Sequence, residues 1–376
     1  MKQQGLLHLC SYYFGSSVYK DLFDSLSGYV QPAHQYVFSA VRRTENLNRL
    51  PPSGSTLVAV RCLNELTRLS FVIKQVTIFI SFILKFDTSI LRARVDLIHA
   101  HTLYSDGFLA FFISCVFKKK YALTIRSTDV NLGLKFYAHW GWLTKLVIKN
   151  AECVVFLSRK HESIIKDKFG KNIKRSCIVP NGVRAFWIEN SLQEKAAKSL
   201  NETLVGVYVG VINKNKNIES AIKGFFQVTE KGKKKFIVVG GTYAEYCRHY
   251  RPLSADLVEN VLFVGQCSKE QVLQHLVTSD IFVMPSIFET FGLSYIESIS
   301  QLTPVVYSRG QGIDGLFDDG VIGFPCNPRN VTSICDAINK TLEVFPLGIS
   351  FQKENPVKDF SWEKIAEKMM AQVYCA

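Results

Sequence analysis

Short apolar runs alternate with longer stretches of helical periodicity along the whole chain. Continuous apolar runs are typical of strands buried on both faces, and their alternation with helices is typical of parallel βαβ units. In the first half we predict strands at 6–10, 56–60, 97–100, 122–125, 153–156 and 177–179. In the second half we predict strands at 204–209, 236–239, 261–264, 281–284 and 305–307. The pattern therefore predicts an α/β protein with two doubly wound, Rossmann-like domains.

The turn Pro180-Asn181-Gly182-Val183 separates the two series of strands. Asn-Gly tolerates positive φ and is therefore favourable in a sharp turn. Open α/β sheets bind ligands at the carboxyl ends of their strands. The crevice between two such sheets is the expected ligand site.

The charge balance favours an anionic partner. The chain has 45 Lys and Arg against 32 Asp and Glu, a net charge of +13. Nucleic acid, an acidic membrane surface and a phosphorylated ligand all fit this charge. A nucleic-acid module would need basic residues interleaved with aromatics on one face, and no such stripe is found, so we expect no nucleic-acid partner.

The most apolar segment, residues 71–84, is shorter than the roughly 20 residues that a membrane span needs. It is interpreted either as a core helix or as an interfacial helix whose lysines face anionic headgroups, and both interpretations stay open. The chain start carries too short an apolar run for a signal peptide. Ten cysteines are spread along the chain without a CxxC pair, which predicts core thiols in a reducing, cytoplasmic compartment.

The most informative segment follows the predicted strand 281–284 and reads Pro-Ser-Ile-Phe-Glu-Thr-Phe-Gly-Leu-Ser-Tyr-Ile-Glu. We expect a helix to begin near Gly292. The first N–H groups of a helix have no internal partner and carry partial positive charge, which suits a diphosphate. Glu289 precedes the helix and would lie beside whatever the phosphate carries. Glu297 lies inside the helix, where it could accept hydrogen bonds from a ribose.

Glu289 and Glu297, with seven residues between them, resemble the E-x7-E signature of retaining glycosyltransferases with the GT-B fold. The longer pattern PS-x-x-E-x-FG-L-x-x-x-E is similar to glycosyltransferase family 4. Other segments resemble that family in the same order along the chain: VDLIHAH at 95–101, ALTIRSTDV at 122–130, VPNGV at 179–183, the turn at 209–217 and FSW at 360–362.

The resemblance implies a GT-B fold, in which two Rossmann-like domains face each other across a cleft and a C-terminal helix returns to the first domain. Residues 1–186 plus 360–376 would form the acceptor-binding domain, and 187–359 the nucleotide-sugar-binding domain. The implied activity is metal-independent, retaining transfer from a nucleotide-diphosphate sugar, without a cofactor. The implied acceptor is a saccharide or a lipid-linked intermediate of bacterial surface polysaccharide (lipopolysaccharide, capsule or exopolysaccharide). Peripheral contact with the inner face of an anionic membrane would fit such an acceptor.

The resemblance and the positions of residues after predicted strands together give the expected site residues. The catalytic set is Glu289, Lys216 and Arg126. The donor-binding set is Gly15, Ser16, Gly210, Lys216, Gly265, Thr290, Phe291, Gly292, Leu293 and Glu297. The acceptor-side set is His101 and Asp129. Each of Glu289, Glu297 and Lys216 also has a plainer interpretation, as a helix-terminal charge, a solvated helix residue and a surface lysine respectively.

No metal is expected, because the chain has no Asp-x-Asp pair. His99 and His101 alternate on a predicted strand, and without a third ligand nearby they favour a structural role.

Three positions depart from the family pattern. Val211 stands where the family usually has Arg, Arg126 where it has His, and Arg184 where it has Asp. A guanidinium does not replace a neutral imidazole equivalently. These departures leave the donor open and keep one alternative in view, a catalytically silent nucleotide-sugar-binding protein. A second alternative, from the same fold, is an epimerase or hydrolase that acts on the nucleotide sugar alone.

Overall fold

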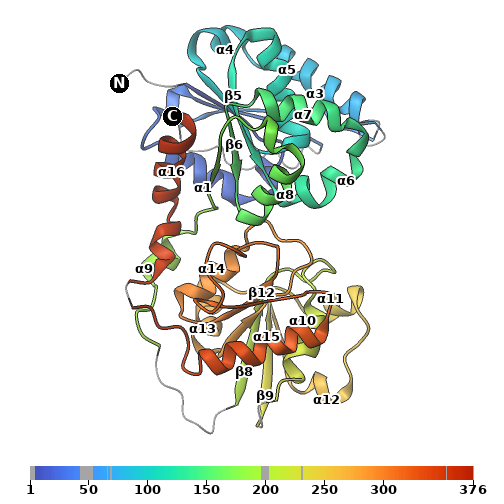
Figure 1. Cartoon of the computed structure of the whole chain (residues 1–376), viewed down its shortest axis with the longest axis vertical. Coiled ribbons are helices and arrows are strands. Elements are labelled where there is room, and N and C mark those ends of the chain that lie inside the picture. The colour runs from blue at the N-terminus through green and yellow to red at the C-terminus, as the bar shows by residue number, and fades with distance from the viewer. Residues whose placement is uncertain are drawn as a thin grey trace. The chain divides into compact units, whose positions relative to one another are not determined.

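The computed structural model describes residues 5–42, 54–65, 67, 70–195, 203–229, 232–352 and 354–375. The chain divides into two compact units, and each is described by itself (Figure 1). The first unit comprises Met1–Leu157, His161–Gly182 and Trp362–Ala376, and the second comprises Ser158–Lys160 and Val183–Ser361.

The first unit is built on a seven-stranded sheet in the order β3-β2-β1-β4-β5-β6-β7, with every neighbouring pair parallel. Its strands are β1 (Leu6–Leu9), β2 (Gln35–Val41), β3 (Thr56–Arg61), β4 (Leu97–Ala100), β5 (Lys120–Ile125), β6 (Cys153–Phe156) and β7 (Ser176–Ile178). The helices of the first unit are α1 (Ser17–Leu26), α3 (Phe71–Lys85), α4 (Thr88–Arg94), α5 (Phe108–Phe117), α6 (Leu134–Phe136), α7 (Gly141–Asn150), most of α8 (Arg159–Phe169) and α16 (Trp362–Met369). Helices lie on both faces of this sheet (Figure 1), so its central strands are fully buried.

The C-terminal helix α16 returns to the first unit and packs against α1 (Figure 1). The Trp362 ring lies over Gly182, where a Cβ atom would come within 2.5 Å of the ring. Beyond α16, the Tyr374 hydroxyl lies 2.6 Å from Nδ1 of the buried His99. The expected return of the C-terminal helix is therefore confirmed.

The second unit is built on a six-stranded parallel sheet in the order β10-β9-β8-β11-β12-β13. Its strands are β8 (Leu204–Val209), β9 (Lys234–Val239), β10 (Val261–Gly265), β11 (Ile281–Val283), β12 (Val305–Ser308) and β13 (Gly323–Cys326). Its helices are α9 (Ala185–Glu189), α10 (Ile218–Phe226), α11 (Tyr243–His249), α12 (Ala255–Val258), α13 (Lys269–Thr278), α14 (Leu293–Ser300) and α15 (Val331–Val344). Two doubly wound parallel sheets are thus confirmed.

Two strands were not predicted. β2 is buried along its whole length, but it begins with Gln35 and its apolar run is interrupted by Ser39. The Gln35 amide is accommodated because its Nε2 donates to the carbonyl oxygen of Phe23 at 3.0 Å. β13 contains Pro325, which is tolerated because β13 is an edge strand.

Among the described helices, none is both long enough and apolar enough to cross a bilayer. The apolar segment at 71–84 forms α3, which buries Gln75, Ile78 and Phe82 against the first unit. All ten cysteines are free, and four of them are buried. The prediction of core thiols therefore holds for Cys10, Cys153, Cys326 and Cys335, whereas Cys115, Cys247 and Cys375 are exposed.

Candidate functional site

Two neighbouring strands of the second sheet bring Lys216 and Glu289 together. Lys216 lies in the turn between β8 and α10, and Glu289 lies in the loop between β11 and α14. Because β8 and β11 are parallel neighbours, their carboxyl ends meet at the same edge of the sheet. The Lys216 Nζ lies 2.5 Å from Glu289 Oε2, and the two side chains are only 20% and 11% exposed. The two residues that the sequence singled out as catalytic therefore form one ion pair.

Asn215 joins the turn after β8 to the loop after β11 by hydrogen bonds. Its Nδ2 donates to the Phe288 carbonyl oxygen at 2.9 Å, and its Oδ1 accepts from the Phe288 N–H at 3.0 Å. Its own carbonyl oxygen accepts from the Ile287 N–H at 2.8 Å. These three bonds fix the backbone next to Glu289. The sequence analysis missed this role of Asn215, although its place in a short turn after β8 was a usable signal.

The Glu289 carboxylate and backbone are held by their neighbours. Oε1 accepts from the Thr290 N–H at 3.0 Å, and Oε2 accepts from the Ser286 hydroxyl at 3.4 Å. The Glu289 N–H donates to Gln311 Oε1 at 3.1 Å, and the Glu289 carbonyl oxygen accepts from the Gly312 N–H at 3.2 Å. Residues in the loops after β11 and β12 thus both orient Glu289. Glu289 is therefore a positioned side chain and not a free surface charge.

The expected helix start lies one residue beyond Gly292. α14 begins at Leu293, and Gly292 caps it in the left-handed region with φ 82°. A Cβ atom at Gly292 would lie 2.4 Å from the Tyr295 ring, so this turn requires glycine. In the part of the chain that the structure describes, the N–H groups of Gly292 and Leu293 have no protein acceptor. These two amides are therefore suited to an anion.

Other residues around this turn hold its conformation by packing and by hydrogen bonds. Phe291 is buried and packs against Phe360 at 5.8 Å between ring centroids. Thr290 is half-buried, and its N–H donates to the Glu289 carboxylate. The Tyr295 hydroxyl donates to the Met284 carbonyl oxygen at 2.5 Å and thereby ties α14 to the end of β11.

Glu297 lies a little over one turn into α14 and is half-buried. Burial raises the pKa of its carboxyl to about 7, and the positive charge of Arg184 acts in the opposite direction. Arg184, one of the departures from the family pattern, is therefore an electrostatic neighbour of Glu297.

Gly210 and Gly265 lie at the carboxyl ends of β8 and β10. Gly265 has φ 74°, and its carbonyl oxygen accepts from the Gly240 N–H at 2.7 Å. A Cβ atom at Gly240 would meet the Gly210 carbonyl oxygen at 2.4 Å, so the strand ends approach closely here. Val211 is 55% exposed. Lys214 is exposed in the same turn as Lys216, which makes it a candidate for the cation that Val211 does not supply.

In the first unit, Arg126 follows β5 and is half-buried. Its Nε donates to the His101 carbonyl oxygen at 3.1 Å, and its guanidinium lies 4.6 Å from the centroid of the Tyr19 ring. Asp129 is buried and accepts from the N–H groups of Arg126 at 3.0 Å and Tyr104 at 3.3 Å. Burial raises the pKa of Asp129. In this structure Asp129 shapes the turn that presents Arg126.

His101 belongs to a buried cluster of three imidazoles. The sequence suggested that His99 and His101 lack a third partner, which is wrong: His8 on β1 faces His99 in the register of β1 and β4. Ring nitrogens of the three residues lie within 4.8 Å of one another. Burial lowers the pKa of His8 to about 3 and the pKa values of His99 and His101 well below their usual range, which favours the neutral form of the rings.

Hydrogen bonds within the protein already use most of these ring nitrogens. His8 Nδ1 lies 3.1 Å from His101 Nε2, and His99 Nε2 lies 2.8 Å from the Thr124 hydroxyl. His99 Nδ1 is taken by Tyr374. The cluster is therefore a hydrogen-bonded packing unit below the carboxyl edge of the first sheet.

Gly15 and Ser16 lie at that same edge, after β1. Ser16 is the N-cap of α1, and its Oγ accepts from the Val18 N–H at 3.4 Å. Sequence reasoning missed Asp106, a buried carboxylate that follows β4 and accepts from the Ser11 N–H at 2.9 Å. Burial raises the pKa of Asp106 to about 6. Its position after a strand was the signal that could have found it.

Comparison with known proteins agrees with this architecture. Two family descriptions match consecutive parts of the chain: "Glycosyltransferase Family 4" over residues 42–185 and "Glycosyl transferases group 1" over residues 178–346. A glycogen synthase of Mycobacterium tuberculosis is 25% identical over 304 residues, which covers 75% of this chain and 69% of the relative. A putative teichuronic acid biosynthesis glycosyltransferase of Bacillus subtilis, TuaC, is 27% identical over 255 residues, covering 65% of this chain and 61% of the relative.

Solved structures are similar over nearly the whole length. Sucrose-phosphate synthase from Thermosynechococcus elongatus has a TM-score of 0.74 at 19% identity and covers 99% of this chain and 98% of its own. Anabaena Alr3699/HepE in complex with UDP-glucose has a TM-score of 0.68 at 14% identity and covers 99% of this chain and 100% of its own. The chain belongs to the group 1, family 4 glycosyltransferases and has the GT-B fold. It is a glycosyltransferase.

Proposed function

We propose that the chain transfers a sugar, with retention of anomeric configuration, from a nucleotide-diphosphate sugar to a saccharide or lipid-linked acceptor. The observation that carries this proposal is the Lys216–Glu289 ion pair beside the amides of Gly292 and Leu293, which have no acceptor among the described residues. A diphosphate needs cations and N–H donors, and a sugar needs a positioned carboxylate. The second unit supplies both at one edge of one sheet.

In this proposal the diphosphate competes with Glu289 for Lys216. Lys216 and the amides at the start of α14 would hold the diphosphate, and Glu297 would accept hydrogen bonds from ribose hydroxyls. Glu289, released from Lys216, would contact hydroxyls of the donor sugar. Binding to the leaving group strengthens as its negative charge grows, which lowers the barrier to transfer.

The chemical step balances without a protein base. The acceptor hydroxyl attacks the anomeric carbon from the face that the diphosphate leaves, so the new glycosidic bond forms as the carbon–oxygen bond to the diphosphate breaks. The electron pair of that bond stays with the diphosphate, and a phosphate oxygen takes the hydroxyl proton. Since the chain has no Asp-x-Asp pair, we expect Lys216 and the amides to meet the diphosphate charge without a divalent ion.

Arg126, held between the His101 carbonyl oxygen and the Tyr19 ring, is proposed to contact a sugar or a phosphate of a substrate. The relative named for teichuronic acid biosynthesis favours a bacterial surface polysaccharide as the product. A lipid-linked acceptor of that kind would place the reaction at the inner face of the cytoplasmic membrane.

A thermal-shift screen of nucleotide sugars tests the donor, because a ligand that binds only the folded protein stabilises it by roughly 2.7 kcal/mol at one hundred times its dissociation constant. We expect one nucleotide sugar to raise the melting temperature and to be consumed only when an acceptor is added, in EDTA as well as without it. Consumption without acceptor would instead identify a hydrolase or epimerase. Binding without transfer to any acceptor of a broad panel would identify a silent binding protein.

A further inference from the structure

The first unit exposes a broad apolar surface on the helices that cover its sheet. On α3, Val72, Val76, Ile80 and Leu84 recur every four residues and are 47%, 50%, 51% and 73% exposed. They lie on the side of α3 opposite to its buried Ile78 and Phe82. α3 is therefore apolar on two faces, and packing within the unit uses only one of them.

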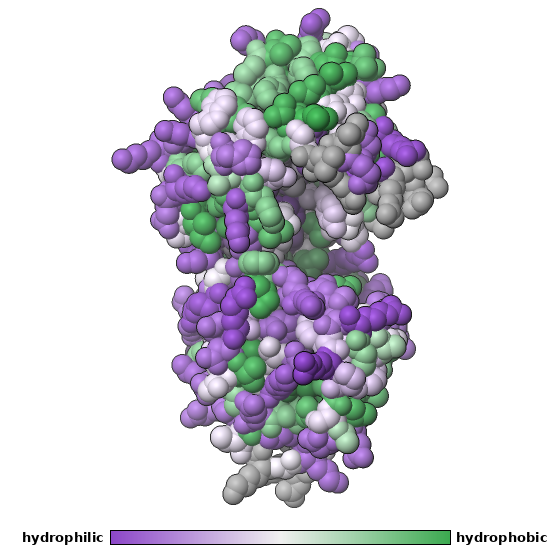
Figure 2. All heavy atoms as spheres, turned by 90° about the vertical axis from the view of Figure 1, so that its right-hand side faces the viewer, coloured by the Kyte–Doolittle hydropathy of each residue, from purple (hydrophilic) through white to green (hydrophobic). Residues whose placement is uncertain are grey.

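Neighbouring helices extend this surface. The exposed apolar side chains there are Val116 on α5, Phe136 on α6, and Trp142 and Leu146 on α7. Figure 2 shows hydrophobic side chains gathered over the outer surface of the first unit. Contiguous exposed apolar patches of this kind mark interaction sites. We call the exposed apolar side chains of α3, α5, α6 and α7 the apolar face.

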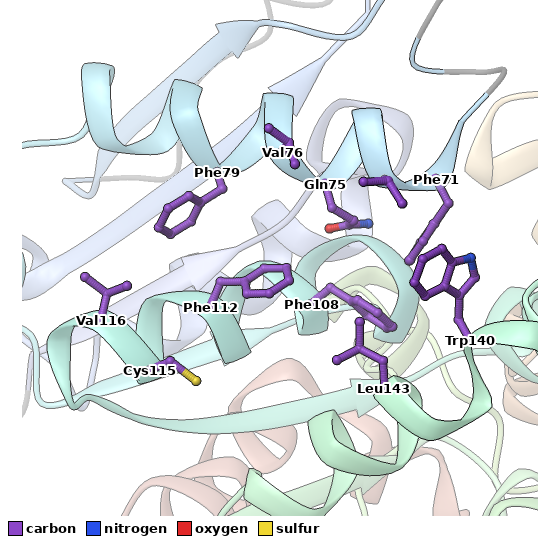
Figure 3. A pocket seen from close by; sticks show the side chains of 11 residues that line it. Phe71, Gln75, Val76, Phe79, Phe108, Phe112, Cys115, Val116, Trp140 and Leu143 are labelled. Atoms are coloured by element: carbon purple, nitrogen blue, oxygen red, sulfur yellow. The ribbon is translucent and has the colours of Figure 1, made fainter.

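A groove of about 360 Å³ runs through the apolar face between α3 and α5 (Figure 3). Eleven residues line it: Phe71, Val72, Gln75, Val76, Phe79, Phe108, Phe112, Cys115, Val116, Trp140 and Leu143. The side-chain amide of Gln75 is turned into the unit, where its Nε2 donates to the Tyr104 carbonyl oxygen at 2.7 Å. The groove is thus lined by apolar side chains and occupies the gap between the two helices.

The groove begins at the functional edge of the sheet. Phe71, at the start of α3, packs against Phe108 at 4.9 Å and Tyr137 at 4.6 Å between ring centroids. Next to it, the Lys74 Nζ donates to the Ser105 hydroxyl at 2.7 Å, in the segment that follows β4. An apolar chain in the groove would therefore have its end near the residues that follow β4, close in the chain to His101.

The helices that form the apolar face carry basic charge only. The helices α3, α5, α6 and α7 and the segment after α5 contain no Asp or Glu. Two of their eight lysines, Lys74 and Lys119, donate hydrogen bonds within the unit. The other six are exposed: Lys85, Lys118, Lys120, Lys135, Lys145 and Lys149. A second copy of this chain would bring these lysines against each other in a two-fold interface, which is unfavourable. An anionic bilayer surface instead complements both the apolar side chains and the lysines.

We propose that this face docks on an anionic lipid bilayer, with α3 lying in the interface and an acyl chain of the bilayer in the groove between α3 and α5. Docking would bring the acceptor-side edge of the first unit to lipid-linked substrates. The proposal goes beyond transfer itself, since it assigns a separate surface and a separate partner.

Vesicle co-sedimentation tests the docking. We expect the protein to bind vesicles of phosphatidylcholine with phosphatidylglycerol and to bind vesicles of phosphatidylcholine alone much less. Binding should weaken with salt, and it should fall about fivefold for each surface-facing lysine removed, as in K118Q/K120Q. The double variant V76D/I80D should abolish binding. V344D, at a 47% exposed valine of α15 in the second unit, should bind like the wild type.

Brominated acyl chains provide a second readout. Trp140 lines the groove and Trp142 is 62% exposed beside it, so tryptophan fluorescence should be quenched by lipids brominated in the acyl chain, and W142F should reduce the quenching. Equal binding by V76D/I80D and wild type, with each variant folded by its melting temperature, would overturn the proposal. So would equal binding to both kinds of vesicle.

The test is independent of the proposed transfer reaction. E289Q, which should lose transfer, is expected to bind vesicles like the wild type. A protein that transfers sugar but ignores vesicles would refute the docking alone, and one that binds vesicles but never transfers would refute the proposed function alone. Dimers that persist in the wild type and dissociate in V76D/I80D, without vesicle binding, would show that the apolar face is covered by a second copy instead.

Discussion

The Lys216 ammonium and the Glu289 carboxylate are 2.5 Å apart, although 73 positions separate them in the chain. Two adjacent parallel strands, β8 and β11, end beside each other and place both side chains at one edge. A half-buried ion pair of this kind gains little stability over a well-packed apolar pair, because desolvation offsets its attraction. Its position at the carboxyl edge therefore favours a functional role.

Glu289→Gln should abolish most of the transfer activity while leaving the fold intact. The variant keeps the size of the side chain but removes the charge that we assign to the donor sugar. We expect the transfer rate to fall roughly 10²–10³-fold, the loss typical of removing one electrostatic contact to a transition state. Transfer is measured by product formation and folding by the melting temperature. Wild-type turnover in E289Q would reject the assignment.

Asn215→Ala should impair transfer without touching any ligand. Removing the side chain leaves the Phe288 N–H and carbonyl oxygen without their partners. We expect a stability loss of about 1–3 kcal/mol, measured by denaturant unfolding, together with a lower kcat. Asn339→Ala is the matched control, because Asn339 Oδ1 also accepts two hydrogen bonds, from the Thr229 N–H and hydroxyl, far along the chain from Glu289. If N339A lowers kcat as much as N215A does, the effect of Asn215 is one of general stability only.

Glu297 should make the protein less stable as the pH rises. Its pKa is about 7 in the folded protein against 4.5 for an ordinary glutamate, so the folded state binds the proton more tightly. The stabilisation from this proton is complete below pH 4.5 and is lost between pH 4.5 and about 7.

Glu297→Gln removes this titration. The melting temperature of the variant should therefore exceed that of the wild type increasingly from pH 5 to pH 8, by roughly 2–4 °C for each kcal/mol recovered. Glu343→Gln, at an exposed glutamate of α15, should leave the pH dependence unchanged. Parallel pH profiles for wild type and E297Q would show that Glu297 titrates normally.

Most of the fold could be predicted from the sequence, because a strand that is buried on both faces consists of a continuous run of apolar residues. β6 and β8 were predicted to the residue, since nothing polar interrupts them. β2 was missed because its buried Gln35 finds an acceptor for its Nε2 only in the folded unit, and β13 because an edge position tolerates Pro325. Neither condition is visible before the strands are assembled.

The candidate site was predictable only in part for a related reason. The motif around Glu289 and the start of α14 after Gly292 could be predicted, because the residues that define them are consecutive in the chain. The residues that hold this loop by hydrogen bonds, such as Asn215 and Gln311, come from other loops. Which loops lie next to it depends on the order of the strands in the sheet. His8 joined His99 and His101 for the same reason, because β1 pairs with β4 across 91 positions of chain.

The most direct test of the account is the affinity for the free nucleoside diphosphate, measured by calorimetry on the wild type, K216Q and E289Q. The nucleoside is that of the sugar nucleotide found in the thermal screen. Since Glu289 and the diphosphate compete for Lys216, we predict that K216Q binds the diphosphate more weakly and that E289Q binds it more tightly than the wild type. Equal affinities in all three proteins, or weaker binding in both variants, would contradict the claim that the diphosphate binds through Lys216 in competition with Glu289.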